Sequence, residues 1–379
     1  MKQIDFKSVP SPSFVVDERL LIKNLELLKS IQDQTNCDIL LALKGFSMWS
    51  TFSIARHYLK GITASSLFEA HLGFEEFGKE VHAYAPAYAD HEMDEYLQYI
   101  DHIVFNSFDQ LHRHKAKVKA SDKPISIGLR VNPGYSEVET PLYDPCYMNS
   151  RLGIPFESFR PMELQDVEGI HFHAMCEQGA DVLERILIRF EEKYGEYLHQ
   201  MKWVNFGGGH HITREGYDVE LLVNLINRVQ NTYNVKVILE PGEAIALNTG
   251  YLVATVLDTI KNGMNLAILD TSATCHMPDT LEMPYRPMII GSGLPNEKKY
   301  TYRLGGMTCL AGDIIGDYSF DEPLKPGDTL VFTDMAHYTM VKTHMFNGVN
   351  LPSICLYNEK EGLQVIRTFN YNDYKGRLS

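Results

Sequence analysis

Eight short apolar segments, each followed by a longer amphipathic or polar stretch, run through the first two thirds of this chain. They are residues 39–44, 61–66, 81–86, 102–107, 125–133, 169–174, 202–209 and 236–242. Their apolar and β-branched content favours strands. The intervening segments 93–100, 181–201 and 218–233 place apolar residues at intervals of three and four, as helices do. Alternating strands and helices of this number predict an α/β fold, a (β/α)₈ TIM barrel, with a doubly wound open sheet as the alternative.

The sequence beyond about residue 250 has a different pattern. Strand-like runs alternate with turn residues and show little helical periodicity, at residues 251–260, 265–272, 301–306, 328–334 and 363–371. This pattern predicts a C-terminal β-sandwich or β-barrel domain. A further short strand within residues 9–20 is expected to join it. The expected domains are a barrel over residues 25–255 and a β domain made of residues 1–24 and 256–379.

Composition limits the classes of partner. The chain has 379 residues, 44% hydrophobic and 22% charged, which suffices for two folded domains. A net charge of −14 disfavours nucleic acid or an anionic membrane as partner and is compatible with a cationic small molecule. The six cysteines lack CxxC spacing, the first residues lack an apolar signal core, and no apolar stretch approaches about 20 residues. We therefore expect a cytoplasmic protein with free thiols and no bound metal.

Residues at the carboxyl ends of the expected strands suggest a binding site, because chemistry in barrels of this type is located there. These residues are Lys44, His171 and His173, the glycines Gly207, Gly208 and Gly209, and Glu240. Each alone has an ordinary structural explanation: a solvated lysine, a hydrogen-bonded core histidine, a tight glycine turn, or a carboxylate that begins a turn. Their convergence at one end of the barrel favours a shared function.

This combination meets the requirements of pyridoxal phosphate. Its aldehyde needs an amine, its phosphate needs backbone N–H donors, its ring needs a flat partner, and its pyridine nitrogen needs a carboxylate that keeps it protonated. The sequence supplies a lysine, three consecutive glycines, an imidazole and a glutamate. It therefore predicts pyridoxal phosphate as the cofactor.

Six segments carry a family resemblance: LALKGF, HFHAMCE, NFGGGHHIT, LEPGEA, HMPDTLEMPYRP and TCLAGD. Over essentially its whole length, the chain resembles the pyridoxal-phosphate decarboxylases with a barrel and a β domain, which include those acting on ornithine, arginine and diaminopimelate. The likeness is greatest to the branch acting on carboxynorspermidine and carboxyspermidine. The resemblance implies a homodimer with shared active sites that decarboxylates a carboxylated polyamine in spermidine biosynthesis.

The same resemblance implies roles for individual residues. Lys44 would be the Schiff-base lysine, and His173 would stack on the cofactor ring. The three glycines and Tyr338 would hold the phosphate. Glu240 would face the pyridine nitrogen. Cys309 would act in the site of a second subunit as the proton donor.

Three departures from the family pattern bear on the substrate. Glu243 stands where the family has an arginine, Cys176 where a serine is common, and Leu310 where an acidic residue is common. These changes disfavour ornithine and diaminopimelate. Because a carboxylated polyamine carries cationic amines along its arm, we expect Glu243 and Asp279 to contact them. The alternative is that each carboxylate pairs with an arginine such as Arg286.

Other functions on this scaffold are a decarboxylase of another basic amino acid, a racemase, or a protein that carries the cofactor without turnover. Racemases of this type avoid a strong carboxylate at the ring nitrogen, so Glu240 disfavours one. Proteins that only carry the cofactor lack the β domain. Carboxynorspermidine and carboxyspermidine differ by one methylene, worth only about 1–3 kcal/mol in a pocket, and the sequence does not separate them.

Overall fold

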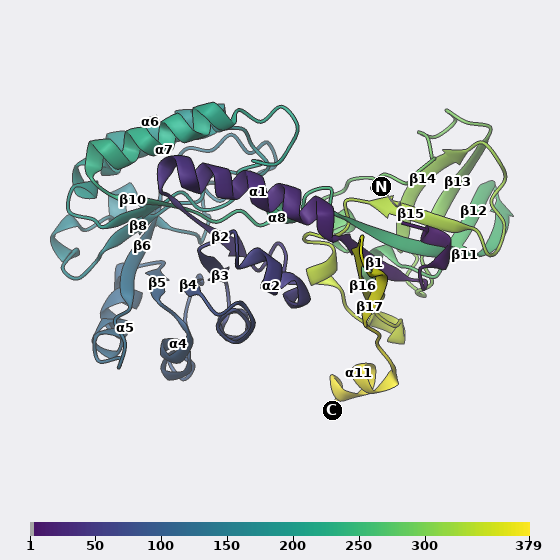
Figure 1. Cartoon of the computed structure of the whole chain (residues 1–379), viewed down its shortest axis with the longest axis horizontal. Coiled ribbons are helices and arrows are strands. Elements are labelled where there is room, and N and C mark those ends of the chain that lie inside the picture. Colours follow the sequence, from purple (N-terminus) through teal and green to yellow (C-terminus); the bar gives the residue numbers. More distant parts are fainter. Residues whose placement is uncertain (1–3) are drawn as a thin grey trace. The chain divides into compact units, whose positions relative to one another are not determined.

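The computed structural model describes residues 4–379, which divide into two compact units (Figure 1). One unit is Lys23–Ile245 and contains the parallel strands. The other, here called the sheet domain, joins the N-terminal residues up to Ile22 to Ala246–Ser379. The sequence-based limit at residue 255 falls inside β11 (Gly250–Asn262), a strand of the sheet domain.

Eight parallel strands close the barrel. They are β2 (Asp38–Ala42), β3 (Gly61–Ala64), β4 (Glu80–Tyr84), β5 (His102–Phe105), β6 (Ser126–Asn132), β8 (Gly169–His171), β9 (Trp203–Asn205) and β10 (Lys236–Leu239). Neighbouring strands pair in this order, and β10 pairs with β2, which completes the ring. The predicted TIM barrel is confirmed with all eight of its strand segments, and the open sheet is excluded.

Helices follow most of these strands. The longer ones are α1 (Glu18–Thr35), α3 (Leu67–Leu72), α4 (Met93–Tyr99), α5 (Phe108–Lys119), α6 (Ala180–Leu198) and α7 (Val219–Tyr233), and the short ones α2 (Phe52–Ala55) and α8 (Glu243–Ala246). Polar caps fix several starts: the Ser107 hydroxyl accepts from the N–H of Gln110, and Asp218 accepts from that of Leu221. Between β6 and β8 the chain forms only β7 (Ile154–Pro155) and two 3₁₀ turns, so the alternation is not strict.

The barrel interior is packed around Trp203. Its indole lies with Leu40, Val104 and Ile238 in one buried cluster. Gly128 and Gly169 on the neighbouring strands make room for the ring, because a Cβ atom there would lie 2.3 and 2.1 Å from indole carbons. The centre of the barrel is therefore filled, and functional groups lie at its two ends.

The sheet domain is one eight-stranded sheet. Its strands are β1 (Ser13–Asp17), β11, β12 (Met264–Leu269), β13 (Tyr300–Gly305), β14 (Ile314–Phe320), β15 (Thr329–Thr333), β16 (Ser353–Asn358) and β17 (Gly362–Arg367). β1 pairs with β11 and β16, which confirms that the N-terminal strand joins this domain. Strands β14 and β16 were not predicted. In β14, Gly316 and Asp317 interrupt the apolar pattern on which the prediction depends.

All six cysteines have free thiols, as predicted. Within residues 4–379, no helix combines the length and the apolar character needed to cross a bilayer.

Candidate active site

The carboxyl ends of four barrel strands carry the predicted residues of this domain. Lys44 follows β2, His173 follows β8, Gly207, Gly208 and Gly209 follow β9, and Glu240 and Glu243 follow β10. Because the strands are parallel, these ends share one face of the barrel. The structure therefore brings these seven predicted residues to the same end of one domain.

Lys44 lies in a tight loop. A Cβ atom on Gly45 would approach the Cα of Gly242 to 2.7 Å, so the loops after β2 and β10 touch and need glycine there. The Lys44 side chain is exposed to solvent. The surrounding protein nevertheless removes enough water to lower the pKa of Lys44, and the positive charge of Arg130 lowers it further. A lowered pKa enriches the neutral amine, which is the nucleophilic form.

Arg130 is a buried cation near this site, and it was not predicted. It lies on β6, and its guanidinium carbon is 4.6 Å from the centroid of the Tyr84 ring. The Tyr84 ring in turn stacks on His171 at a centroid distance of 5.4 Å. The cation is thus held by an aromatic face, which places a fixed positive charge near Lys44.

The three glycines form a turn whose backbone leaves no space for a Cβ atom at any of the three positions. Gly207 and Gly209 have φ of 70° and 83°, and Cβ atoms there would lie 2.6 Å from the Phe172 carbonyl oxygen and 2.1 Å from that of Met175. The N–H of Gly208 donates to Nδ1 of His173 over 2.9 Å. Burial holds the pKa of His173 well below its usual value. A neutral imidazole is therefore fixed beside the glycine turn.

Glu240 is a buried carboxylate with two fixed partners. Asn205 donates to its Oε1 over 2.8 Å, and the Nε2 of His171 lies 3.2 Å from its Oε2. Burial, the largest influence, would raise the pKa of Glu240, but the interactions with His171 and Asn205 outweigh it and lower that pKa. Glu240 is therefore an ionised, oriented carboxylate at neutral pH.

Glu243 begins α8 in the position where the family has an arginine. Its Oε1 lies 3.2 Å from Nε2 of the buried His211, and no arginine among residues 4–379 pairs with it. Glu177 completes the group: side-chain atoms of Glu177, His211 and Glu243 all lie within 4.8 Å of one another. Glu177 adopts a left-handed φ of 53°, which is uncommon outside glycine and typical of functional turns. Two carboxylates beside one imidazole suit a cationic ligand.

Asp279, the first residue of α10 (Asp279–Glu282), lies in the sheet domain. Its Oδ2 accepts hydrogen bonds from the hydroxyls of Tyr285 at 2.7 Å and Thr339 at 2.9 Å, whereas Oδ1 is buried and has no hydrogen-bond partner in the described part of the chain. Arg286 does not pair with it; its guanidinium instead lies over the Tyr318 ring at 4.6 Å. Asp279 therefore offers one carboxylate oxygen to a donor.

Cys309 and Tyr338 also belong to the sheet domain. Cys309 is exposed on the loop between β13 and β14, and its N–H donates to Oδ1 of Asn347 over 2.8 Å. Buried Asp313 anchors this loop by accepting from the hydroxyl of Thr308 over 2.7 Å. Tyr338 has a left-handed φ of 45° and directly precedes Thr339, the partner of Asp279. Both residues thus lie on loops of fixed geometry.

Comparison with known proteins identifies the family. A family model described as "Pyridoxal-dependent decarboxylase, C-terminal sheet domain" matches residues 13–336. The chain belongs to this family of pyridoxal-dependent decarboxylases. It is therefore a carboxy-lyase whose cofactor is pyridoxal phosphate.

Three carboxylated-polyamine decarboxylases or their structures are similar to the chain over nearly their full lengths. The carboxynorspermidine/carboxyspermidine decarboxylase of Campylobacter jejuni is 46% identical, over 98% of this chain and 99% of the relative. The carboxyaminopropylagmatine decarboxylase of Synechocystis is 45% identical, over 98% and 96%. The crystal structure of the C. jejuni carboxynorspermidine decarboxylase with norspermidine has a TM-score of 0.90 and 45% identity, over 97% of this chain and 100% of that one. The diaminopimelate decarboxylase of Helicobacter pylori, at 17% identity and a TM-score of 0.84, shares the fold.

The barrel residues fit the cofactor of this family. Lys44 provides an amine of lowered pKa, and the glycine turn provides three consecutive residues without side chains, next to His173. Each oxygen of Glu240 has one partner and keeps a lone pair for a ring N–H donor. His173 supplies a flat neutral ring.

Several residues of this site were not assigned from the sequence. Asn205 and Arg130 were missed, and His171 was noticed without a role; each acquires its role from a partner on another strand. Glu177 and His211 were also missed. The doubled histidine was a usable signal, because it directly follows the glycine turn at the carboxyl end of β9.

Proposed function

We propose that this enzyme decarboxylates carboxynorspermidine and carboxyspermidine, forming norspermidine and spermidine. The observation that carries the proposal is Glu243 beside His211 and Glu177, where the broader family has an arginine. A long arm with two cationic amines suits this acidic group, whereas diaminopimelate ends in a carboxylate beside its amine and ornithine carries a single amine on a shorter chain. The 46% identical C. jejuni relative with this activity supports the same substrates.

When bound, pyridoxal phosphate supplies an aldehyde that joins to an amine and a ring that withdraws electrons from the carbon carrying the carboxyl group. Lys44 would hold the aldehyde, and the amine of the substrate would take its place. Glu240, oriented by Asn205 and His171, would keep the ring nitrogen protonated. His173 would pack on the ring, and the glycine turn with Tyr338 would hold the phosphate. Cys309 would be the proton donor.

Glu243 and Asp279 are proposed to bind the amines of the long arm, which are cationic at neutral pH. Asp279 has one oxygen committed to Tyr285 and Thr339 and one oxygen without a partner. A single acceptor oxygen suits an ammonium group, whose donors are independent. A planar guanidinium prefers two parallel bonds to both carboxylate oxygens. Asp279 thus favours a substrate that ends in an amine.

A second candidate substrate is carboxyaminopropylagmatine, because a relative with that activity is 45% identical over 98% of this chain. This substrate ends in a guanidinium group. Glu177 and Glu243 together could accept the parallel hydrogen bonds of a guanidinium group. The acidic group of the barrel is therefore compatible with a substrate arm that ends in an amine or in a guanidinium. The two candidates differ in the terminal group alone, and kinetics separates them.

We further propose that the enzyme is a cytoplasmic homodimer, in which Cys309 acts in the site of a second subunit. The exposure of Cys309 on an anchored loop of the sheet domain supports this role.

The decisive experiment measures CO₂ release from five substrates: carboxynorspermidine, carboxyspermidine, carboxyaminopropylagmatine, ornithine and diaminopimelate. We expect kcat/KM for the first two to differ by no more than about 200-fold, because one methylene separates them. The other three should be turned over more slowly. Highest kcat/KM for carboxyaminopropylagmatine would transfer the assignment to the second candidate, and highest kcat/KM for an amino acid would reject both.

A further inference from the structure

The amino end of the barrel, opposite to the site described above, carries a second group of ligand-type side chains. Glu80 and His82 are two residues apart on β4, so both point to the same face of the strand. His102 begins β5 and lies directly across from His82 in the parallel ladder. The strand register alone therefore brings one carboxylate and two imidazoles together.

These three side chains are close enough to share an ion. Their ligand atoms lie within 4.8 Å of one another, and Nε2 of His82 is 3.3 Å from Oε2 of Glu80. The rings of His82 and His102 stack at a centroid distance of 3.8 Å. The His82 side chain is 4% exposed and that of Glu80 34%, so the group is buried on one side and reached by solvent on the other.

His102 has unused binding capacity. Its Nδ1 is buried and has no hydrogen-bond partner among the residues that the structure describes, which costs free energy unless something binds there. Its ring also contacts Trp203 at a centroid distance of 5.4 Å. Burial lowers the pKa of His102 to about 3, so the imidazole is uncharged at neutral pH. An uncharged imidazole is the form that binds metal ions.

We propose that Glu80, His82 and His102 bind one divalent transition-metal ion of the zinc type at the amino end of the barrel. Two histidines and one glutamate form an established zinc ligand set, with water as the fourth ligand. Imidazole and carboxylate ligands select such ions over magnesium or calcium, which prefer oxygen alone. The site lies outside the decarboxylase machinery and does not depend on the substrate proposed above.

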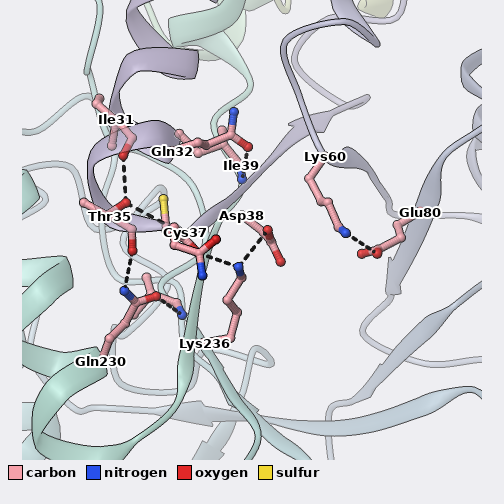
Figure 2. Close-up of polar contacts among 12 residues, drawn as sticks. Ile31, Gln32, Thr35, Cys37, Asp38, Ile39, Lys60, Glu80, Gln230 and Lys236 are labelled. Atoms are coloured by element: carbon pink, nitrogen blue, oxygen red, sulfur yellow. Dashed lines mark hydrogen bonds and ion pairs between the residues drawn. The ribbon is translucent and has the colours of Figure 1, made fainter.

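Two features of this site oppose binding of the ion. Stacked rings direct their lone pairs along parallel lines, so one imidazole must turn about its Cβ–Cγ bond, a torsion with a broad energy profile. In addition, Nζ of Lys60 lies 2.8 Å from Oε1 of Glu80, and Figure 2 shows this pair. Lys60 therefore occupies one carboxylate oxygen and repels a cation, and its removal should strengthen binding.

Zinc chloride is titrated into untagged holoenzyme in competition with a chromogenic chelator. We expect one zinc ion per chain at this site. Glu80→Gln, His82→Gln and His102→Gln should each weaken binding at least about tenfold. Lys60→Met should tighten it at least about threefold, since it removes a charge a few ångströms from the ion. Cobalt chloride should give visible absorption bands in the parent that His102→Gln lacks.

Two controls define the result. His112 pairs with Glu163 at 3.1 Å on the surface, so His112→Gln removes a comparable histidine and should leave zinc binding unchanged. Glu243→Gln tests the carboxylates around His211 as the competing site.

Zinc binding lost in Glu243→Gln but retained in His102→Gln would overturn the proposal. So would the absence of stoichiometric zinc, or an affinity that Lys60→Met leaves unchanged. If a buried histidine variant does not fold, Lys60→Met and Glu80→Gln, whose side chains are partly exposed, still decide the question.

Discussion

Asn205 joins the carboxylate of Glu240 to the glycine turn: its Nδ2 donates to Oε1 of Glu240 over 2.8 Å, while its Oδ1 accepts from the N–H of Gly207 over 2.8 Å. The side chain is 1% exposed, so it has little freedom to move. One amide therefore sets the distance between the proposed ring-nitrogen carboxylate and the proposed phosphate turn.

Glu240→Gln should slow decarboxylation on the order of 10²-fold while the cofactor still binds, because an amide does not hold a proton on the ring nitrogen. Asn205→Asp places a second carboxylate beside Glu240 and should raise its pKa. Single-turnover CO₂ release and cofactor absorbance measure both effects. A parent-like rate in Glu240→Gln would mean that another group keeps the ring protonated.

Lys44→Ala should fold and lack covalently held cofactor, with activity near background. The reason is that Lys44 provides an amine of lowered pKa at the mouth of the barrel. Borohydride treatment followed by mass spectrometry of the peptide measures the covalent attachment. Lys23→Ala, a change in α1 outside this group, is the matched control and should keep both properties. Full turnover by Lys44→Ala would contradict the central assignment.

The sequence predicted those features of the fold that depend on residues adjacent in the chain. Strands β2 and β10 are mostly apolar runs, and the residues that follow them, Lys44 and Glu240, are identified by counting along those runs. The roles of His171, Asn205 and Arg130 were not readable in this way, since each depends on a partner brought next to it by barrel closure.

The group at the amino end was missed for the same reason. His102 lies 20 residues after His82, a spacing that resembles no metal motif, and only the β4–β5 register makes the two rings neighbours. Glu177 was missed because its left-handed backbone is not encoded by any local preference of glutamate.

Gly169→Ala should destabilise the barrel by about 1–3 kcal/mol, because the new methyl group would overlap the Trp203 indole. Urea denaturation measures the change in the free energy of unfolding. Gly376→Ala is the control: no atom lies within 4 Å of a Cβ there, and the residue ends the helix α11 (Tyr371–Gly376), so stability should change little. Equal stabilities of the two variants would show that the barrel interior repacks freely.

Mixing Lys44→Ala with Cys309→Ala protein should restore activity if the sheet domain of one subunit serves the barrel of another. Each variant alone is expected to be inactive, while a mixed dimer contains one site with both native residues. Activity is followed after subunit exchange has been verified by native mass spectrometry. The absence of recovery would place Cys309 in the site of its own chain or outside the site.

Glu243→Gln and Asp279→Asn should each raise KM for carboxynorspermidine at least tenfold, since losing one partner of a desolvated charge pair costs about 2–5 kcal/mol. The cofactor spectrum should not change, because neither residue is assigned to cofactor binding. In Asp279→Asn the hydroxyls of Tyr285 and Thr339 retain an acceptor oxygen, so the loss is confined to the charge.

The controls for this pair are carboxylates on the surfaces of the same domains, one exposed and one partly exposed. Glu192→Gln removes a partner of Arg189 on the barrel surface, and Asp317→Asn removes a partner of Arg303 on the sheet domain. Neither should change KM, because surface pairs of this kind contribute little. A rise in KM that is large for carboxynorspermidine and small for ornithine would locate the effect on the long arm. Parent-like KM in both test variants would mean that the arm is bound elsewhere, and the substrate would then be defined only as a basic amino acid.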